Sequence, residues 1–100
     1  MLPHSNSKRE MGIEVIASIR HLISAATTGE PNAEPVAAFL MAWYDPYTYG
    51  GFNVTDLWDM EDATRYAVTT LFEWLGSNRT TPQDLELDLV FEAISARWAN

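Results

Sequence analysis

Residues 59–78 read DMEDATRYAVTTLFEWLGSN, and this stretch decides the fold class. Asp59 is typical of a helix N-cap, and Glu61 and Asp62 follow where acids are favourable against the helix dipole. The apolar positions at helical spacing are Met60, Ala63, Ala67, Leu71 and Trp74, with Val68, Phe72 and Leu75 beside them. This broad apolar face predicts a central helix that packs on more than one side and ends near Gly76.

Two helices are expected before this one. Ser7 and Glu10 fit a capping box, and the helix that follows is expected to end at Gly29, which suits a C-cap. A second helix is expected from a cap near Asn32 to Asp45, which precedes a proline and therefore disfavours the helical conformation. The apolar stripes of these helices are Val15, Ile16, Ile19, Leu22, Ile23 and Ala26, then Val36, Phe39, Leu40 and Trp43.

Shorter elements are expected on both sides of the long helix. Residues 47–52, YTYGGF, predict an aromatic and glycine-rich turn. Asn53 is expected to cap a helical turn over residues 54–58. Residues 81–84, TPQD, again combine a cap, a proline and an acid in the pattern that opens a helix.

The C-terminal segment carries two competing patterns. Residues 85–89, LELDL, alternate with a period of two, which indicates a strand, whereas Leu87, Phe91 and Ile94 form a helical stripe. No second segment offers itself as a pairing partner for a strand, so we expect a helix from about Leu87 to Ala99. The sequence thus predicts an all-α fold, a compact single-domain bundle of about four to five helices without a sheet. This domain is expected to span residues 1–100, with residues 1–6 frayed.

The composition bounds the class of protein. With 100 residues the chain can fill one core, and 47% apolar residues are too many for a disordered chain. The absence of cysteine excludes disulfides, thiolate metal sites and cysteine nucleophiles. The start of the chain does not resemble a signal peptide, and no apolar run approaches the ~20 residues that span a bilayer. A cytoplasmic protein of the bacterial host, without a membrane partner, is therefore expected.

No motif of an enzyme is present. His4 and His21 are the two histidines, and neither lies in a helical metal-binding pattern. Nucleophile elbows and phosphate-binding loops are also absent, and Gly50 with Gly51 is better explained as a turn. Paired carboxylates acting across a cleft remain a third hypothesis, because helix capping accounts better for the acids concerned. The sequence predicts no enzyme, no cofactor, no metal and no catalytic residue.

The charges are unevenly distributed along the chain. Fourteen acids face six bases, yet no Lys or Arg lies between Arg20 and Arg65 or from Thr80 to Ala96. The acids of these two stretches are Glu30, Glu34, Asp45, Asp56, Asp59, Glu61 and Asp62, then Asp84, Glu86, Asp88 and Glu92. Helix capping and solubility explain about half of them. The others predict a negative surface for a basic partner protein, whereas a net charge of −8 argues against direct binding to nucleic acid.

The aromatic residues divide into two groups. The four tryptophans, Trp43, Trp58, Trp74 and Trp98, fit helical stripes and are predicted to lie in the core. Tyr44, Tyr47, Tyr49 and Phe52 cluster around one turn instead. Some of these four rings either seal the turn onto the core or anchor a protein partner, because Tyr carries much of the binding energy at interfaces.

Part of the chain resembles a known family. The block FLMAW at residues 39–43 and the block GGFNVTDLW at residues 50–58 carry the resemblance. They are similar to a small uncharacterised bacterial family that is carried largely on integrative conjugative elements. The match extends over roughly residues 15 to 98, and Thr81 stands where an aromatic residue often precedes the proline. The family offers no catalytic residues to transfer, and the resemblance implies a mobile-element setting.

Two functions are expected from these observations. Small acidic proteins without enzymatic motifs in that setting are similar to anti-CRISPR proteins, which often block the nucleic-acid-binding surface of a Cascade-type effector. The leading hypothesis is therefore a non-enzymatic inhibitor that binds a basic surface of a type I CRISPR effector complex and competes with target DNA. The predicted contacts are Asp45, Asp56, Asp59, Glu61 and Asp62, with Tyr47 and Tyr49 as anchors. The alternative is a non-catalytic interaction or assembly module of a conjugative element that binds a partner helix or itself.

Overall fold

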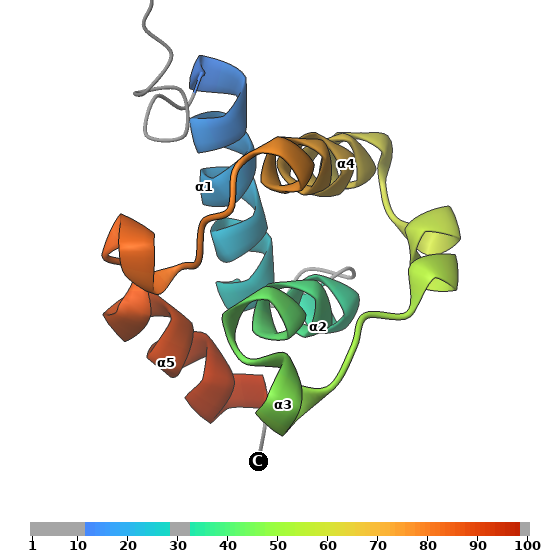
Figure 1. The fold of residues 1–100 in the computed structure, drawn as a ribbon. Helices are drawn as coiled ribbons and strands as arrows, with labels where there is room; N and C mark the ends of the chain where they lie inside the picture. Colours follow the sequence, from blue (N-terminus) through green and yellow to red (C-terminus); the bar gives the residue numbers. More distant parts are fainter. Residues whose placement is uncertain (1–11, 29–32, 99–100) are drawn as a thin grey trace, which may run out of the picture.

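A computed structural model describes residues 12–28 and 33–98 of the chain. In chain order the elements are α1 (Ile13–Thr27), α2 (Ala33–Tyr44), α3 (Pro46–Tyr49), the 3-10 helix η2 (Val54–Asp59), α4 (Asp62–Ser77), the 3-10 helix η3 (Gln83–Leu85) and α5 (Asp88–Trp98) (Figure 1). No strand occurs within these residues. The predicted all-α class is therefore confirmed, with four longer helices and three short elements between them.

Helices α1 and α2 hold the centre of the molecule. Helix α1 packs most extensively against α4 and also against α2, which in turn packs against α5 and α3 (Figure 1). The largest fully buried side chains are Phe91, Leu22, Leu40, Leu71, Ile94, Val36, Thr64 and Pro82. The expectation that the helix of residues 59–78 is central is wrong, because the main packing partner of α4 is α1 alone. The flank of α4 that carries Phe72 stays exposed.

The first two helices follow their predicted stripes except at Ile16, which is exposed because it lies at the edge of the buried face of α1. Val15, Ile19 and Leu22 of α1 are buried, and so are Val36 and Leu40 of α2. These two helices meet through these apolar faces, which together form much of the core. The predicted capping residues Ser7, Glu10, Gly29 and Asn32, and the predicted fraying of residues 1–6, lie outside the described residues.

The aromatic turn after α2 contains a short helix that the sequence did not predict. Asp45 follows α2 and caps α3, accepting hydrogen bonds from the Thr48 backbone nitrogen at 3.2 Å and the Thr48 hydroxyl at 2.7 Å. Pro46 occupies the first turn, where its missing N–H has no cost. Gly50 ends the helix with a φ of 81°, a left-handed conformation that glycine adopts without strain. Asp45-Pro46 thus ends one helix and begins another.

The N-cap of α4 lies two residues after the predicted position. Asn53 caps η2 by accepting a hydrogen bond from the Thr55 backbone nitrogen at 3.3 Å, as predicted. Asp59 was expected to cap α4, but it is the last residue of η2, and Glu61 occupies the N-cap position. The reason is that Met60, between them, has an extended backbone and a buried side chain. Met60 therefore belongs to a turn and not to the helix.

The C-terminal segment is helical, as predicted. Thr81 and Asp84 form a reciprocal capping box, with backbone-to-side-chain distances of 3.0 and 3.2 Å. This box opens η3, which ends at Glu86 in the left-handed conformation with a φ of 60°. Helix α5 then begins at Asp88, close to the expected Leu87. The alternation of residues 85–89 therefore marks the turn between η3 and α5 and not a strand.

Two aromatic residues predicted for the core lie on the surface. Trp58 is 80% exposed and Phe72 is 69% exposed. Trp58 belongs to η2, whose three residues per turn do not continue the spacing of an α-helical stripe. The other three tryptophans are half-buried. Of these, Trp43 donates its indole N–H to the Thr80 carbonyl at 2.9 Å, and Trp98 donates to the Ala26 carbonyl at 2.7 Å. No helix among the described residues is long and apolar enough to cross a membrane.

Candidate protein-binding surfaces

Four of the predicted acidic contacts lie together where η2 joins α4. We call Asp56, Asp59, Glu61 and Asp62 the acidic corner. Asp59, Glu61 and Asp62 are exposed, and Asp56 is half-buried. They lie within seven consecutive positions of the chain, where η2 ends and α4 begins, and the first turn of each helix favours acids. The four residues therefore lie in one region of the surface, and their role as contacts stays a prediction.

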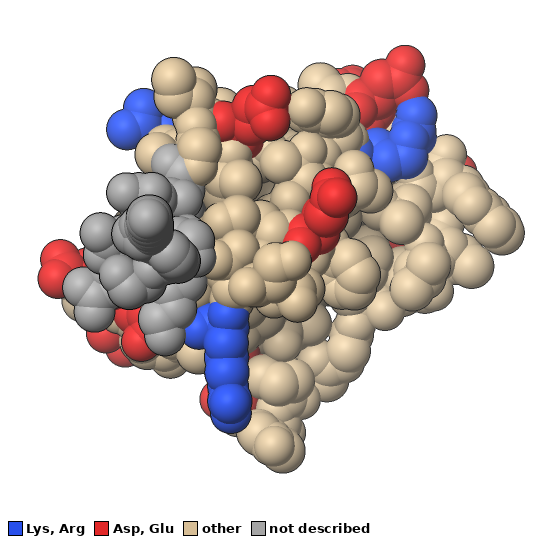
Figure 2. Space-filling view, turned by 45° about the horizontal axis from the view of Figure 1, so that its top comes forward, with Lys and Arg blue, Asp and Glu red and all other residues tan. Residues whose placement is uncertain are grey.

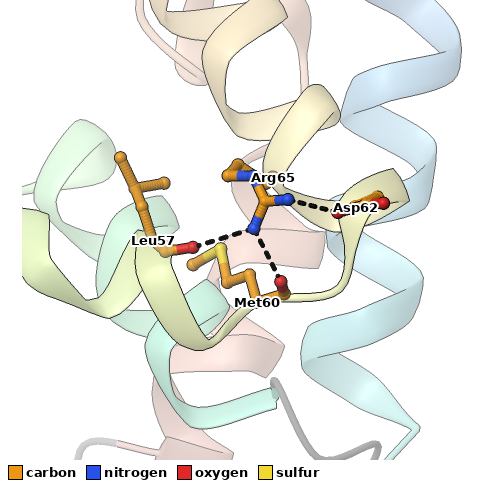
Figure 3. A network of polar contacts seen from close by, with 4 residues as sticks. All are labelled: Leu57, Met60, Asp62 and Arg65. Carbon is orange, nitrogen blue, oxygen red and sulfur yellow. Dashed lines mark hydrogen bonds and ion pairs between the residues drawn. The ribbon is translucent and has the colours of Figure 1, made fainter.

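Arg65 holds the acidic corner together. Its guanidinium donates hydrogen bonds to the carbonyl oxygens of Met60 at 2.9 Å and Leu57 at 3.3 Å, and it pairs with the Asp62 carboxylate (Figure 3). The arginine thus joins the first turn of α4 to the last turn of η2. Its positive charge is already engaged by these acceptors, so the four carboxylates against one guanidinium leave the corner with a net charge of −3.

The other three predicted contacts belong to α3 and differ from one another. Tyr47 is 99% exposed, whereas Tyr49 is half-buried. The Tyr49 hydroxyl hydrogen-bonds to the Ser95 hydroxyl and so ties α3 to α5. Asp45 is half-buried as the cap of α3. Figure 1 shows α3 at the lower end of the molecule and η2 at its right side, so the predicted residues form two groups and not one.

A second acidic region, which sequence reasoning missed, surrounds Tyr44. Partial burial raises the pKa of the Tyr44 phenol above its ordinary value of 10.0, and the charges of Glu92 and Asp88 raise it further. Tyr49 and Asp45 contribute smaller effects in the same direction. We call Asp45, Asp88 and Glu92 the acidic edge. The base-free stretch from Thr80 to Ala96 was the signal in the sequence, but only the packing of α5 against α2 brings its acids close enough to act on Tyr44.

The charge asymmetry is local and does not extend over the whole surface. On the face drawn in Figure 2, acidic and basic side chains are interspersed on a surface that is mostly uncharged. On this face the charges therefore form no single negative field, and a negative surface for a basic partner stays a prediction.

An apolar groove lies between α2, the segment that leads into η2, and the C-terminal half of α4. It has a volume of about 500 Å³ and is lined by Phe39, Ala42, Trp43, Phe52, Val54, Phe72, Leu75 and Gly76. The rings of Phe39 and Phe52 pack edge to face in it, with centroids 5.3 Å apart. Val54 and Phe72 are each about two thirds exposed, at 67% and 69%. None of the described residues that line the groove is charged, so an apolar side chain of a partner would fit it.

No catalytic or metal centre emerges from the described residues. Within residues 12–28 and 33–98, no group of three or more His, Asp or Glu side chains lies close enough to hold a metal ion. His21, the described histidine, contacts the buried Thr64 hydroxyl through Nε2 at 3.0 Å and thereby links α1 to α4. The absence of an enzymatic activity stays a prediction.

Comparison with known proteins identifies one family. The model of a family of unknown function, DUF7673, matches residues 16–99 of the chain. This extent agrees with the resemblance found over residues 15 to 98. No curated protein and no solved structure matches the chain.

Proposed function

We propose that this chain, which belongs to the DUF7673 family of unknown function, is a protein-binding domain without catalytic activity whose acidic corner docks on a basic surface of a partner protein. One observation carries the proposal. Asp59, Glu61 and Asp62 are exposed within four residues, and the one arginine among them is engaged by Asp62 and two backbone carbonyls. Such a patch favours association with positive charge, because complementary potentials steer encounter.

The specific partner we propose is the basic nucleic-acid-binding surface of a type I CRISPR effector complex. The support is the resemblance to a mobile-element family, in which small acidic proteins are similar to anti-CRISPR inhibitors. Carboxylates that project from adjacent helix ends offer such a surface the negative charges it normally receives from phosphates. The domain would then compete with target DNA for the same basic surface without binding nucleic acid itself.

Displacement of DNA tests this function directly. Labelled target DNA is bound to a purified type I effector complex, and its anisotropy is followed as the domain is added at about 0.05 M and about 0.5 M salt. We expect displacement at low salt and its loss at high salt, because salt screens exposed charges. Failure to displace DNA from any type I effector at low salt would overturn the proposed partner.

Charge reversal identifies the surface that acts. Asp59→Lys with Glu61→Lys reverses the corner's net charge from −3 to +1 while Asp62 keeps its pair with Arg65. We expect this variant to displace DNA about tenfold less well. The matched control is Glu14→Lys with Glu73→Lys, which makes the same change of charge at exposed acids of α1 and α4. An equal loss in the control would show that net charge acts and not the corner.

The apolar groove favours a second candidate function, self-association as an assembly module. Exposed apolar surface of this kind, with Val54 and Phe72 on its rim, is common at protein interfaces. Sedimentation across a range of protein concentrations measures the oligomeric state. In this case Phe72→Ser should lower the association constant, whereas Leu89→Ser should not, although Leu89 of α5 is even more exposed than Phe72. A strictly monomeric wild-type protein at millimolar concentration contradicts this candidate.

A further inference from the structure

A pocket of mixed chemistry lies between α2, α3 and the end of α5. It has a volume of about 330 Å³, at the lower end of the range for small-molecule sites, and is lined by Glu34, Ala37, Ala38, Met41, Thr48, Tyr49 and Trp98. Ala37 and Met41 are buried, whereas Glu34 and Thr48 are exposed. The pocket therefore combines a buried apolar floor, two aromatic rings and one carboxylate at the rim.

The fold fixes the two rings of this pocket. The Tyr49 hydroxyl bonds to Ser95 of α5, and the Trp98 indole N–H donates to the Ala26 carbonyl at 2.7 Å. Both polar groups are satisfied within the protein, so the π faces and edges of the rings are what remains for a ligand. Rings held in this way lose little conformational entropy when a ligand binds.

The electrostatics of the pocket favour a cation. No Lys or Arg is among the described residues that line it, and Glu34 supplies a carboxylate. Helix α1 ends at Thr27 and α5 ends at Trp98, so the negative ends of two helix dipoles lie near the indole. An anion would be repelled by Glu34, and a purely apolar ligand would desolvate its carboxylate without a partner.

The indole of Trp98 already attracts one cation. The Arg97 guanidinium carbon lies 5.6 Å from the centroid of the Trp98 ring, within the range of a cation–π interaction. Arg97 does not line the pocket, so its guanidinium does not fill it. Among the described residues, Glu34 forms no ion pair with an arginine.

We propose that this pocket binds the guanidinium group of an arginine side chain, stacked on Tyr49 and Trp98 and paired with Glu34. Arginine fits better than lysine, because its planar group both stacks on aromatic rings and bonds a carboxylate through two nitrogens. The arginine of a basic partner is the natural source, and in that respect the inference deepens the proposed function. The affinity of the pocket for a free guanidinium does not depend on that function.

A titration with a small probe tests the pocket without any partner. N-acetyl-arginine amide is added to ¹⁵N-labelled protein, and the shifts of the Trp98 indole N–H and of the Ala38 and Thr48 amides are followed. We expect saturable shifts at these positions in the millimolar range, since one exposed ion pair and one or two ring contacts supply only modest affinity. N-acetyl-citrulline amide, the neutral isostere, should bind at least about threefold more weakly, and the lysine analogue should fall between them.

Single substitutions distinguish specific binding of the probe in the pocket from non-specific electrostatic attraction to an acidic protein. Glu34→Gln should lower the affinity for the arginine probe about two- to fivefold, and it leaves the buried apolar residues of the pocket unchanged. Glu14→Gln makes the same change of charge at the other end of α1, about 18 Å along the helix from Ala26, and should leave the affinity unchanged. Arg97→Gln should tighten binding about twofold, because it removes a like charge near the indole.

The outcomes are decisive in both directions. Equal binding of the arginine and citrulline probes, or equal affinities of Glu34→Gln and Glu14→Gln, overturns the proposal, and so do shifts that map to the acidic corner. Probe binding without displacement of DNA from an effector keeps the pocket and rejects the proposed partner. Displacement of DNA without probe binding keeps the proposed partner and rejects the pocket.

Discussion

The acidic corner and the acidic edge carry the same kind of charge but are built in different ways. The corner takes its acids from seven consecutive residues, and a local arginine bonds both a carboxylate and two carbonyls there. The edge joins Asp45 to Asp88 and Glu92, which are more than forty positions apart in the chain, around the phenol of Tyr44. The acids of the corner are therefore explained by the preference of helix N-termini for negative charge, whereas the electrostatic effect on Tyr44 arises from tertiary packing. The two patches should respond differently to changes in the core.

The largest effect should come from removing the residue that supports the edge. Phe91 is fully buried, and its ring centroid lies 5.6 Å from the rings of both Trp43 and Tyr44. Phe91→Ala should lower the free energy of unfolding by about 3–5 kcal/mol, because it leaves a cavity between α2 and α5. Urea denaturation measures this change. Leu89→Ala on the same helix is 82% exposed and should stay within about 0.5 kcal/mol of wild type.

The hydrogen bonds of Arg65 to the two carbonyl oxygens should contribute more to stability than its ion pair with Asp62. Arg65→Met removes the donors to Leu57 and Met60 and should cost about 1–2 kcal/mol of unfolding free energy. Asp62→Asn removes only an exposed partner, whose side chain is 96% exposed, and should cost less than about 0.5 kcal/mol. Thermal or urea unfolding distinguishes the two. If both substitutions cost the same, the carbonyl bonds do not hold the turn between η2 and α4.

Most of the fold could be predicted because its signals are local. Caps, prolines and apolar periodicity located all four longer helices, and the capping box at Thr81 and Asp84 formed as its spacing predicts. The errors occurred where tertiary structure decides. Met60 leaves the helix to fill the core, and the exposed Trp58 belongs to a 3-10 turn that an α-helical stripe does not describe. Phe72 continues an apolar face over a flank that no helix covers.

The candidate surfaces were predicted in part for the same reason. The acidic corner is contiguous, so the sequence showed it as one group. Tyr47 and Tyr49 are two residues apart, yet one is exposed and the other is bonded to Ser95, because successive positions of a short helix face different directions. The partners of Asp45 in the edge come from α5, and the pocket at Glu34 joins three helices. Neither combination follows from spacing along the chain.

Neutralising each patch in turn should show which one a basic partner uses. The pairs Asp59→Asn with Glu61→Gln and Asp88→Asn with Glu92→Gln each remove two charges. If the corner is the docking surface, the first pair of substitutions should weaken DNA displacement about threefold. The second pair should weaken it by less than about 1.5-fold. The same assay with wild-type protein gives the reference. A larger effect of the second pair would transfer the proposed docking surface to the edge.

The titration of Tyr44 tests the edge without any partner. Partial burial, and then Glu92 and Asp88, raise the pKa of its phenol above 10.0, so Glu92→Gln should lower this pKa without restoring the ordinary value. The assigned ¹³C chemical shift of the Tyr44 phenol carbon, followed as the pH rises, measures this pKa. Asp59→Asn at the corner is the control and should leave it unchanged.

The same shift sets the direction of a small pH effect on stability. A pKa that is higher in the folded state than in the unfolded chain means that the folded state binds the phenolic proton more tightly. The resulting contribution to stability is complete below pH 10 and is lost as the pH rises through the folded-state pKa of Tyr44. Glu92→Gln should therefore unfold with a shallower alkaline dependence than wild type, whereas Asp59→Asn should follow the wild-type curve. If the two variants behave alike, the field at Tyr44 does not come from the edge, and the distinction between the two patches fails.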